Sequence, residues 1–305
     1  MILAVALTAI SLLGTAPHAD LVDDMGQAGD AEFTARQLVV CWGDDGAVAR
    51  VSDVVQSDGM TRVAGPDGTF VIGDGKMIEQ YAGGIRYLEM SPTSAWRLWD
   101  GYQMTTDPPD VASVLSSGRT VEVTEGGRIR ARFVLDEQTG TPLSTQVYDG
   151  DGSLYRYSVM MEFRPGDADA MSDMDDMPDP EYRAAASAID VPSVAGHYWA
   201  ADSYAAPGGV QVFFTDGLFR FSVFEVSRKS DGGGLSDAPD VEIAGQSGYH
   251  RTYTPGAVSV FWRTADRAYV LVGDLPPDHL EAVLQDLPEP GRPNILKRAW
   301  RWAFG

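Results

Sequence analysis

Residues 143–163, LSTQVYDGDGSLYRYSVMMEF, contain two apolar runs that are separated by two consecutive Asp-Gly pairs. Asp-Gly between runs of this kind is typical of a tight turn that joins two antiparallel strands. The stretch therefore predicts a hairpin made of strands Leu143–Asp149 and Leu154–Phe163. This hairpin is the pattern from which the rest of the fold can be followed in both directions.

The same pattern repeats on the N-terminal side of the hairpin, where Asp-Gly and Gly-Gly pairs again separate short apolar runs. Strands are predicted at Phe33–Cys41, Val48–Gln56, Thr61–Ala64, Thr69–Ile72, Lys76–Tyr81, Ile85–Met90, Thr120–Val123 and Arg128–Leu135. A helix is predicted at Pro109–Ser116, because proline fits a first helical turn and Gly118 can end the helix. A long meander with one or two helices predicts a curved antiparallel sheet with helices on one face.

An acidic stretch follows the hairpin and predicts a domain boundary. Residues 165–181 contain seven acidic side chains, no basic ones and several prolines. Like charges repel one another and the segment has little to bury, so residues 165–187 are expected to form an extended linker. The first domain is thereby placed at residues 20–164.

The second half of the chain returns to strands and predicts a smaller α+β domain at residues 188–288. Its strands are predicted at Val210–Thr215, Leu218–Val226, Gly248–Tyr253, Ala257–Trp262 and Ala268–Gly273. Pro276-Pro277 then opens a predicted helix, Asp278–Leu287. The overall fold class is therefore predicted to be α+β.

Composition restricts the partners and the cellular compartment. The 305-residue chain has a formal net charge of −21, which disfavours binding to nucleic-acid backbones. Its one cysteine, Cys41, excludes an internal disulfide framework. Ile2–Leu13 is an uncharged apolar run followed by small residues, so residues 1–19 are expected to be a secretory signal or an N-terminal anchor. The alternative is a buried apolar strand or helix; a signal or anchor predicts a periplasmic or cell-surface protein.

The C-terminal residues 289–305 differ from the rest of the chain because they are basic and aromatic. Arg292, Lys297, Arg298 and Arg301 lie among Ile295, Leu296, Trp300, Trp302 and Phe304. One interpretation is contact with a membrane surface through Arg292–Gly305, and another is docking into an acidic groove. A frayed C-terminus remains the alternative to both.

Motifs of catalysis and of metal binding are not found. The histidines His18, His197, His250 and His279 form no HExxH pattern; His197 and His250 can meet in space, but lone histidines are usually ordinary polar residues. The stretch after Asp149 starts like a calcium loop but lacks the required Gly and Glu. No GxSxG or phosphate-binding loop is present. A binding protein without catalytic residues, metal or cofactor is therefore predicted, with a hydrolase that has a dispersed site as the alternative.

Four motifs, in this order and spacing, resemble the MucB/RseB family of sigma-factor regulatory proteins. They are LDEQTGTPL at 135–143, YDGDGSL at 148–154, FTDGLFRFSVF at 214–224 and VGDLPP at 272–277. The resemblance extends over roughly residues 30 to 288. It implies that the first domain is similar to the LolA/LppX-type lipoprotein carriers, a half-barrel sheet around a lipid-sized apolar cavity.

The same resemblance implies a function and its partners. Members of the family bind the extracytoplasmic domain of a membrane anti-sigma factor and control its proteolysis in the envelope stress response. A lipid or lipoprotein signal in the first domain is expected to change this binding, which requires coupling between two sites. The alternative function is a lipid or lipoprotein carrier of the cell envelope.

Two sets of residues are candidates for these roles. Asp216, Gly217, Leu218, Phe219 and Phe221 are expected to bind the partner, since the turn and the strand after it present apolar side chains. Trp96, Trp99 and Tyr102 are expected to line the ligand cavity. For both sets the alternative is a role in the hydrophobic core, because apolar side chains that alternate along a strand are usually buried.

Overall fold

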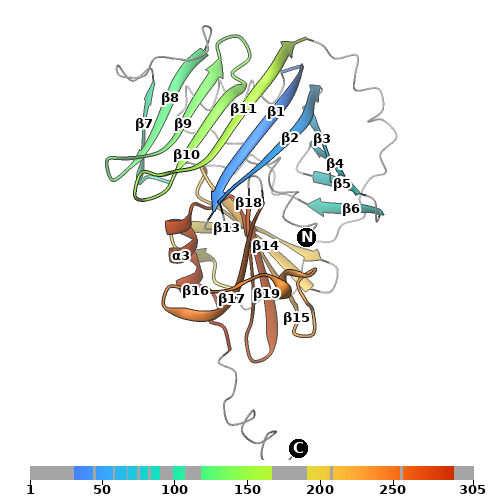
Figure 1. Ribbon diagram of the computed structural model, residues 1–305, viewed down its shortest axis with the longest axis vertical. Coiled ribbons are helices and arrows are strands. Elements are labelled where there is room, and N and C mark those ends of the chain that lie inside the picture. Colours follow the sequence, from blue (N-terminus) through green and yellow to red (C-terminus); the bar gives the residue numbers. More distant parts are fainter. Residues whose placement is uncertain are drawn as a thin grey trace, which may run out of the picture.

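The computed structural model describes residues 31–43, 46–57, 59–66, 68–73, 76–81, 84–89, 99–106, 118–166, 191–206, 209–254 and 257–291. In these ranges the chain forms two antiparallel sheets, one per domain (Figure 1). Several predicted features lie outside the described residues. These are the predicted signal or anchor segment, the predicted helix Pro109–Ser116, Trp96, nearly all of the predicted linker and the tail Arg292–Gly305.

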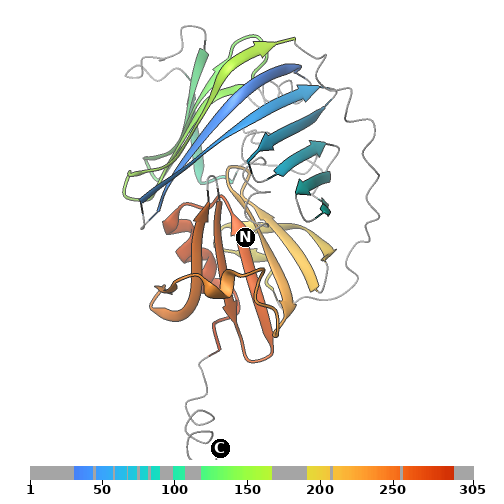
Figure 2. The same ribbon diagram turned by 45° about the vertical axis from the view of Figure 1, so that its right-hand side comes forward.

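The first sheet has eleven strands in the order β6-β5-β4-β3-β2-β1-β11-β10-β9-β8-β7. Their bounds are β1 Phe33–Gly43, β2 Gly46–Ser57, β3 Met60–Gly65, β4 Gly68–Gly73, β5 Lys76–Tyr81, β6 Gly84–Glu89, β7 Tyr102–Thr106, β8 Gly118–Glu125, β9 Arg128–Asp136, β10 Pro142–Tyr148 and β11 Leu154–Pro165. Strands that follow one another along the chain pair as hairpins, except β6 and β7, which lie at opposite edges of the sheet. Strand β1 pairs with β11 in the middle of the sheet, with Leu38 opposite Val159. The sheet is open and strongly curved (Figure 2).

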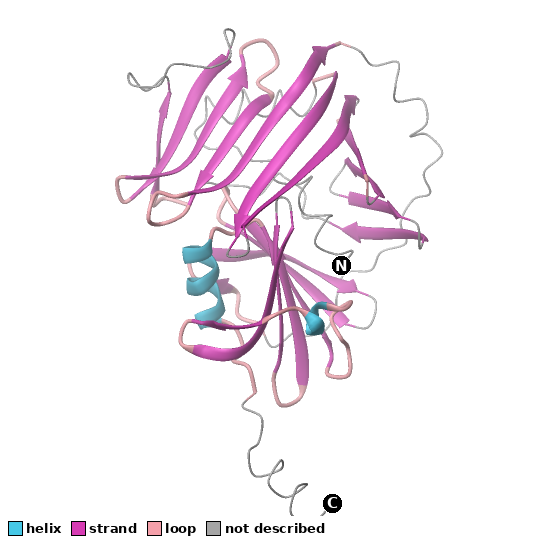
Figure 3. Cartoon of the chain, in the orientation of Figure 1, coloured by secondary structure: helices cyan, strands magenta, loops and turns pink. Residues whose placement is uncertain are grey.

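The second sheet has the order β12-β13-β14-β15-β19-β18-β17-β16. Its strands are β12 Val194–Ala195, β13 Tyr198–Ala206, β14 Gly209–Thr215, β15 Arg220–Ser227, β16 Asp240–Ile243, β17 Gln246–Thr254, β18 Ala257–Arg263 and β19 Arg267–Gly273, with a short 3-10 turn η3 Leu235–Asp237. Helix α3, Pro277–Asp286, follows β19 and buries His279, Leu280, Val283 and Leu284. Strands make up most of both domains (Figure 3).

Two hydrophobic core clusters each contain side chains of both sheets, and the larger cluster lies at the junction described below. It contains Val121 and Phe133 of the first sheet together with Tyr198, Phe221 and Leu280 of the second domain. Each of these side chains is at most 6% exposed. Burial of apolar surface is the main favourable term in folding, so the two domains stabilise one another through a shared interior.

The predicted fold class is confirmed: a curved antiparallel sheet is followed by a smaller sheet with a C-terminal helix. Asp-Gly marks its turn where predicted, between β10 and β11. The predicted strand Leu218–Val226 is wrong at its start, because β15 begins at Arg220. Residues 216–219 instead form a turn in which Gly217 has a left-handed φ of 88°.

Strands β7, β12, β13 and β16 were not predicted from the sequence. Strand β13, YWAADSYAA, mixes small and polar residues without the regular alternation that indicates a half-buried strand. Strands β7, β12 and β16 have only five, two and four residues and lie at edges of their sheets. In the described ranges no helix combines the length and apolarity needed to cross a membrane.

Candidate functional site at the junction of the domains

Asp216 uses one carboxylate oxygen to close its own turn and the other to contact the first domain. Oδ1 accepts hydrogen bonds from the backbone N–H groups of Leu218 and Phe219, at 2.8 and 2.7 Å, and so closes the turn between β14 and β15. Oδ2 accepts a hydrogen bond from the Tyr102 hydroxyl of the first domain at 2.7 Å. The Asp216 side chain is 0% exposed. A buried carboxylate needs such partners, because its desolvation is otherwise costly.

His197 and Trp99 extend this contact. His197, in the turn between β12 and β13, places Nε2 2.9 Å from Asp216 Oδ2. Its ring stacks on the Trp99 ring with a centroid distance of 4.0 Å. The Trp99 backbone N–H also donates to the Asp216 carbonyl at 2.8 Å. Burial, followed by the charge of Asp216, raises the pKa of Tyr102, so its hydroxyl remains a donor at neutral pH.

Asp274 makes a second contact between the domains in the same way as Asp216. It follows β19 in the VGDLPP motif, and its Oδ1 accepts a hydrogen bond from the Arg220 backbone N–H at 2.7 Å. Its Oδ2 lies 3.6 Å from Nη1 of Arg156 on β11, in the first domain. Burial lowers the pKa of Arg220 to about 9, and the charge of Asp274 opposes that shift. Both motif aspartates therefore connect their own turn to the other domain.

Arg130 of β9 makes the third contact, with helix α3. Its Nη2 donates to both carboxylate oxygens of Asp278 at 2.9 Å, and its Nε lies 3.1 Å from Glu125 Oε2. The Arg130 side chain is 2% exposed. Burial alone would raise the pKa of Asp278, but the hydrogen bond from Arg130 lowers it. Burial raises the pKa of the neighbouring Asp149, which is also hydrogen-bonded to Asp278.

Two histidines meet at the junction, and they are not the pair that the sequence suggested. His279 of α3 lies beside His197, with a ring centroid distance of 4.8 Å, whereas the His250 ring contacts the Ala238 carbonyl and the Phe261 ring. His279 Nε2 is 3.2 Å from Glu125 Oε2, and a hydrogen bond between them lowers the pKa of Glu125. Among the described residues, Glu125, His197 and His279 are the group whose side chains could hold a metal ion.

The predicted partner-binding residues lie inside this junction. Asp216, Leu218, Phe219 and Phe221 are all at most 5% exposed, and Gly217 lies in the same turn. Their burial agrees with the alternative that they belong to the core, and their contact with a partner stays a prediction. The ring of Phe221 packs against Phe214 and Tyr198, within the second domain.

Of the predicted cavity residues, Trp99 and Tyr102 lie at the domain junction, and Trp96 is outside the described residues. Tyr102 is 5% exposed and belongs to the shared core. The lining of a ligand cavity by these residues therefore stays a prediction. Sequence reasoning did not find Glu125, Arg130, Asp278 or the pairing of His197 with His279, because their partners are distant along the chain.

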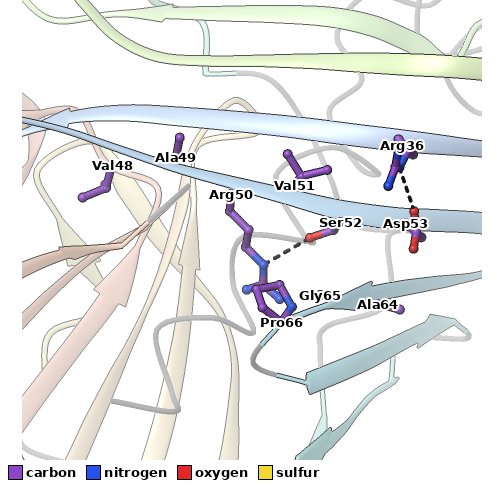
Figure 4. Close-up of a pocket in the computed structure, with 10 residues that line it drawn as sticks. All are labelled: Arg36, Val48, Ala49, Arg50, Val51, Ser52, Asp53, Ala64, Gly65 and Pro66. Carbon is purple, nitrogen blue, oxygen red and sulfur yellow. Dashed lines mark hydrogen bonds and ion pairs between the residues drawn. The ribbon is translucent and has the colours of Figure 1, made fainter.

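A pocket of about 800 Å³ lies elsewhere in the first domain, along β2 (Figure 4). It forms where β2 extends past β3: β2 pairs with β1 over Gly46–Gln56 but with β3 only over Asp53–Ser57. Its lining residues are Arg36, Val48, Ala49, Arg50, Val51, Ser52, Asp53, Ala64, Gly65 and Pro66. Arg50 donates to Ser52 Oγ at 3.1 Å, and Arg36 forms an ion pair with Asp53 at 3.4 Å.

Comparison with known proteins relates the fold to solved structures. No family model and no curated protein matches the sequence. A crystal structure of MucB is 19% identical and matches with a TM-score of 0.53, over 90% of this chain and 99% of that chain. The MucA/MucB complex of Pseudomonas aeruginosa is 18% identical, with a TM-score of 0.51 over 90% of this chain and 100% of that chain.

These matches show that the chain has the fold of MucB over 90% of its length, which confirms the resemblance predicted from the four motifs. A LolA-superfamily protein of Nitrosomonas europaea is 7% identical and matches with a TM-score of only 0.21, over 84% of this chain and 94% of that chain, which is too low to establish a shared fold.

Proposed function

We propose that this protein is a non-enzymatic extracytoplasmic regulator that binds the extracytoplasmic segment of a membrane anti-sigma factor and controls its proteolysis. The observation that carries the proposal is the fold shared with MucB over 90% of the chain, including MucB as it occurs in its complex with MucA. The four family motifs also support the proposal. Two of these motifs contain Asp216 and Asp274, the aspartates that connect the two domains.

Charge indicates what kind of surface the partner presents. The protein has a net charge of −21, so a partner segment with a basic surface would be attracted at long range. Such steering raises the association rate and is screened by salt. A regulator of this type therefore binds faster and more tightly at low ionic strength.

We expect calorimetry to detect saturable one-to-one binding between the full chain and the extracytoplasmic segment of an anti-sigma factor from the same organism. A dissociation constant in the micromolar range or below, corresponding to about −8 kcal/mol or better, fits a specific complex. Because Phe219 is 1% exposed, a Phe219→Asp variant would report on folding rather than on contact. A scrambled segment of identical composition is the appropriate control.

The outcome that contradicts the regulator is an absence of binding by protein whose circular dichroism shows it to be folded. Equal binding of the native and scrambled segments would also count against it, because attraction by net charge alone carries no specificity.

The pocket along β2 favours a second role of the first domain, the binding of a lipid or lipoprotein. Its volume of about 800 Å³ lies within the usual range of ligand pockets. Apolar side chains such as Val48 and Val51 line it together with two arginines, Arg36 and Arg50. This combination suits a ligand with an apolar body and an anionic group. If the ligand changes the affinity for the anti-sigma factor it is a signal, and if it does not the protein is a carrier.

Replacing Ala49 with tryptophan is expected to reduce the amount of co-purified lipid several-fold, because the indole would fill the pocket. Ala49 is exposed on β2, so the larger side chain can be accommodated without disturbing the core. The matched control is Ala47→Trp, two residues away on the same face of β2 and not part of the lining. Mass spectrometry of organic extracts measures the lipid per mole of protein. Similar lipid content in the two variants would show that the pocket is not the binding site.

A further inference from the structure

We propose that Glu125, His197 and His279 form a binding site for a divalent transition-metal ion, Zn²⁺ in the first place, that bridges the two domains. Glu125 ends β8 of the first sheet, His197 precedes β13 of the second, and His279 lies in α3. One ligand atom from each residue lies within 4.8 Å of the others. The proposal does not depend on the anti-sigma factor.

The spacing of the ligand atoms is close to that of a zinc site. Bonds of about 2.0–2.1 Å in a tetrahedral arrangement separate neighbouring ligand atoms by roughly 3.3 Å. His279 Nε2 and Glu125 Oε2 are already 3.2 Å apart. The ring nitrogen of His197 must approach them by roughly 1–2 Å to complete a three-ligand set. Three protein ligands leave the fourth position to water, as is common in open zinc sites.

Both imidazoles are oriented by a second hydrogen bond, as metal-binding histidines usually are. His279 Nδ1 lies 2.6 Å from the hydroxyl of Tyr198, which leaves Nε2 directed toward Glu125. His197 is held by Asp216 at 2.9 Å and by stacking on Trp99. These supporting groups lie in the buried junction, so the rings are ordered without an ion.

The charges around the site also favour a divalent cation. Three carboxylates, Glu125, Asp216 and Asp278, surround it with one cation, Arg130, which leaves two negative charges when both histidines are neutral. Glu125 would contact both Arg130 and the ion, and Arg130 would keep its bidentate contact with Asp278. Two imidazole nitrogens select zinc over the oxygen-preferring Ca²⁺ and Mg²⁺. The Glu125 side chain is 25% exposed, so an ion can reach the site from solvent.

The experiment uses the full chain after treatment with a chelator. Zn²⁺ is titrated in competition with a chromophoric chelator, and thermal unfolding is followed with and without the ion. We expect one site per chain and a higher midpoint of unfolding with Zn²⁺, because the ion binds the folded state through both domains. Co²⁺ in place of Zn²⁺ is expected to give visible d–d absorption typical of a four-coordinate nitrogen and oxygen site.

Three variants test whether Glu125 and His197 bind the ion. Glu125→Gln and His197→Gln each remove one ligand and are expected to weaken Zn²⁺ binding at least tenfold. His250→Gln removes a histidine away from the cluster and is expected to bind as the native protein does. Circular dichroism confirms that each variant is folded, and if one of the two site variants is not, the other carries the test. Either no zinc binding by the native chain, or unchanged binding in the folded site variants, overturns the proposal.

Discussion

Replacing Asp216 with alanine is expected to lower the free energy of unfolding by about 3–5 kcal/mol, the scale of breaking a buried charged network. The substitution removes the acceptor of the Tyr102 hydroxyl and of the Leu218 and Phe219 N–H groups. All of these groups are buried at the junction and would lose a partner that water cannot replace. Urea unfolding followed by circular dichroism measures the change.

The control is Asp266→Ala, which removes an exposed carboxylate from the turn between β18 and β19. Its effect is expected to stay within about 0.5 kcal/mol, as is usual for surface substitutions. Asp216→Asn should fall between the two, since its amide oxygen can still close the turn while its NH₂ group faces Tyr102. Similar stability of the Asp216→Ala and Asp266→Ala variants would refute the role assigned to Asp216.

The second large effect is expected for Arg130→Met, which keeps an unbranched aliphatic stem but removes the guanidinium group and its charge. Asp278 and Glu125, whose side chains are 39% and 25% exposed, would then lose the hydrogen bonds of their cation, at a cost of about 1.5–3 kcal/mol. Loss of this contact acts between domains, so we also expect the single unfolding transition to broaden or to split into two. Denaturant unfolding monitored by both tryptophan fluorescence and circular dichroism detects such a split.

Arg132→Met is the matched control on the same strand. Arg132 pairs with Glu122 at 2.8 Å, but both residues belong to the first sheet and their side chains are 22% and 15% exposed. We expect a loss of at most about 1 kcal/mol and a single transition, because partly exposed pairs contribute little. An equal loss in the two variants would mean that Arg130 has no special function between the domains.

Local sequence patterns were sufficient to predict most of the strands. Asp-Gly and Gly-Gly fix where a chain can reverse within a few residues, so the β10–β11 hairpin could be located without knowledge of the tertiary fold. Pro276-Pro277 located helix α3 in the same way, because proline fits a first helical turn. The end of the turn at Asp216 was more difficult to predict, because Leu218 and Phe219 are apolar and look like the start of strand β15. Their N–H groups bond to Asp216 instead of to a neighbouring strand, which no pattern of hydrophobicity indicates.

The junction itself could not be predicted from local patterns. Tyr102 and Asp216 are 114 residues apart in the chain, Arg130 and Asp278 are 148 apart, and Glu125 and His279 are 154 apart. Such pairs are brought together only by docking of two complete sheets. The motif aspartates Asp216 and Asp274 were the one local signal, and they pointed to this region through family resemblance rather than through spacing.

The pairing of β1 with β11 has a mechanical consequence. Phe33, where the chain enters the first sheet, lies opposite Pro165, where it leaves, so both exits are at the same end of one antiparallel pair. A force applied between these two points would unzip the β1–β11 pair, breaking its hydrogen bonds one pair at a time, instead of shearing all of them at once. Tension along the chain would therefore separate the middle of the sheet at low force, while the hairpins on either side remained closed.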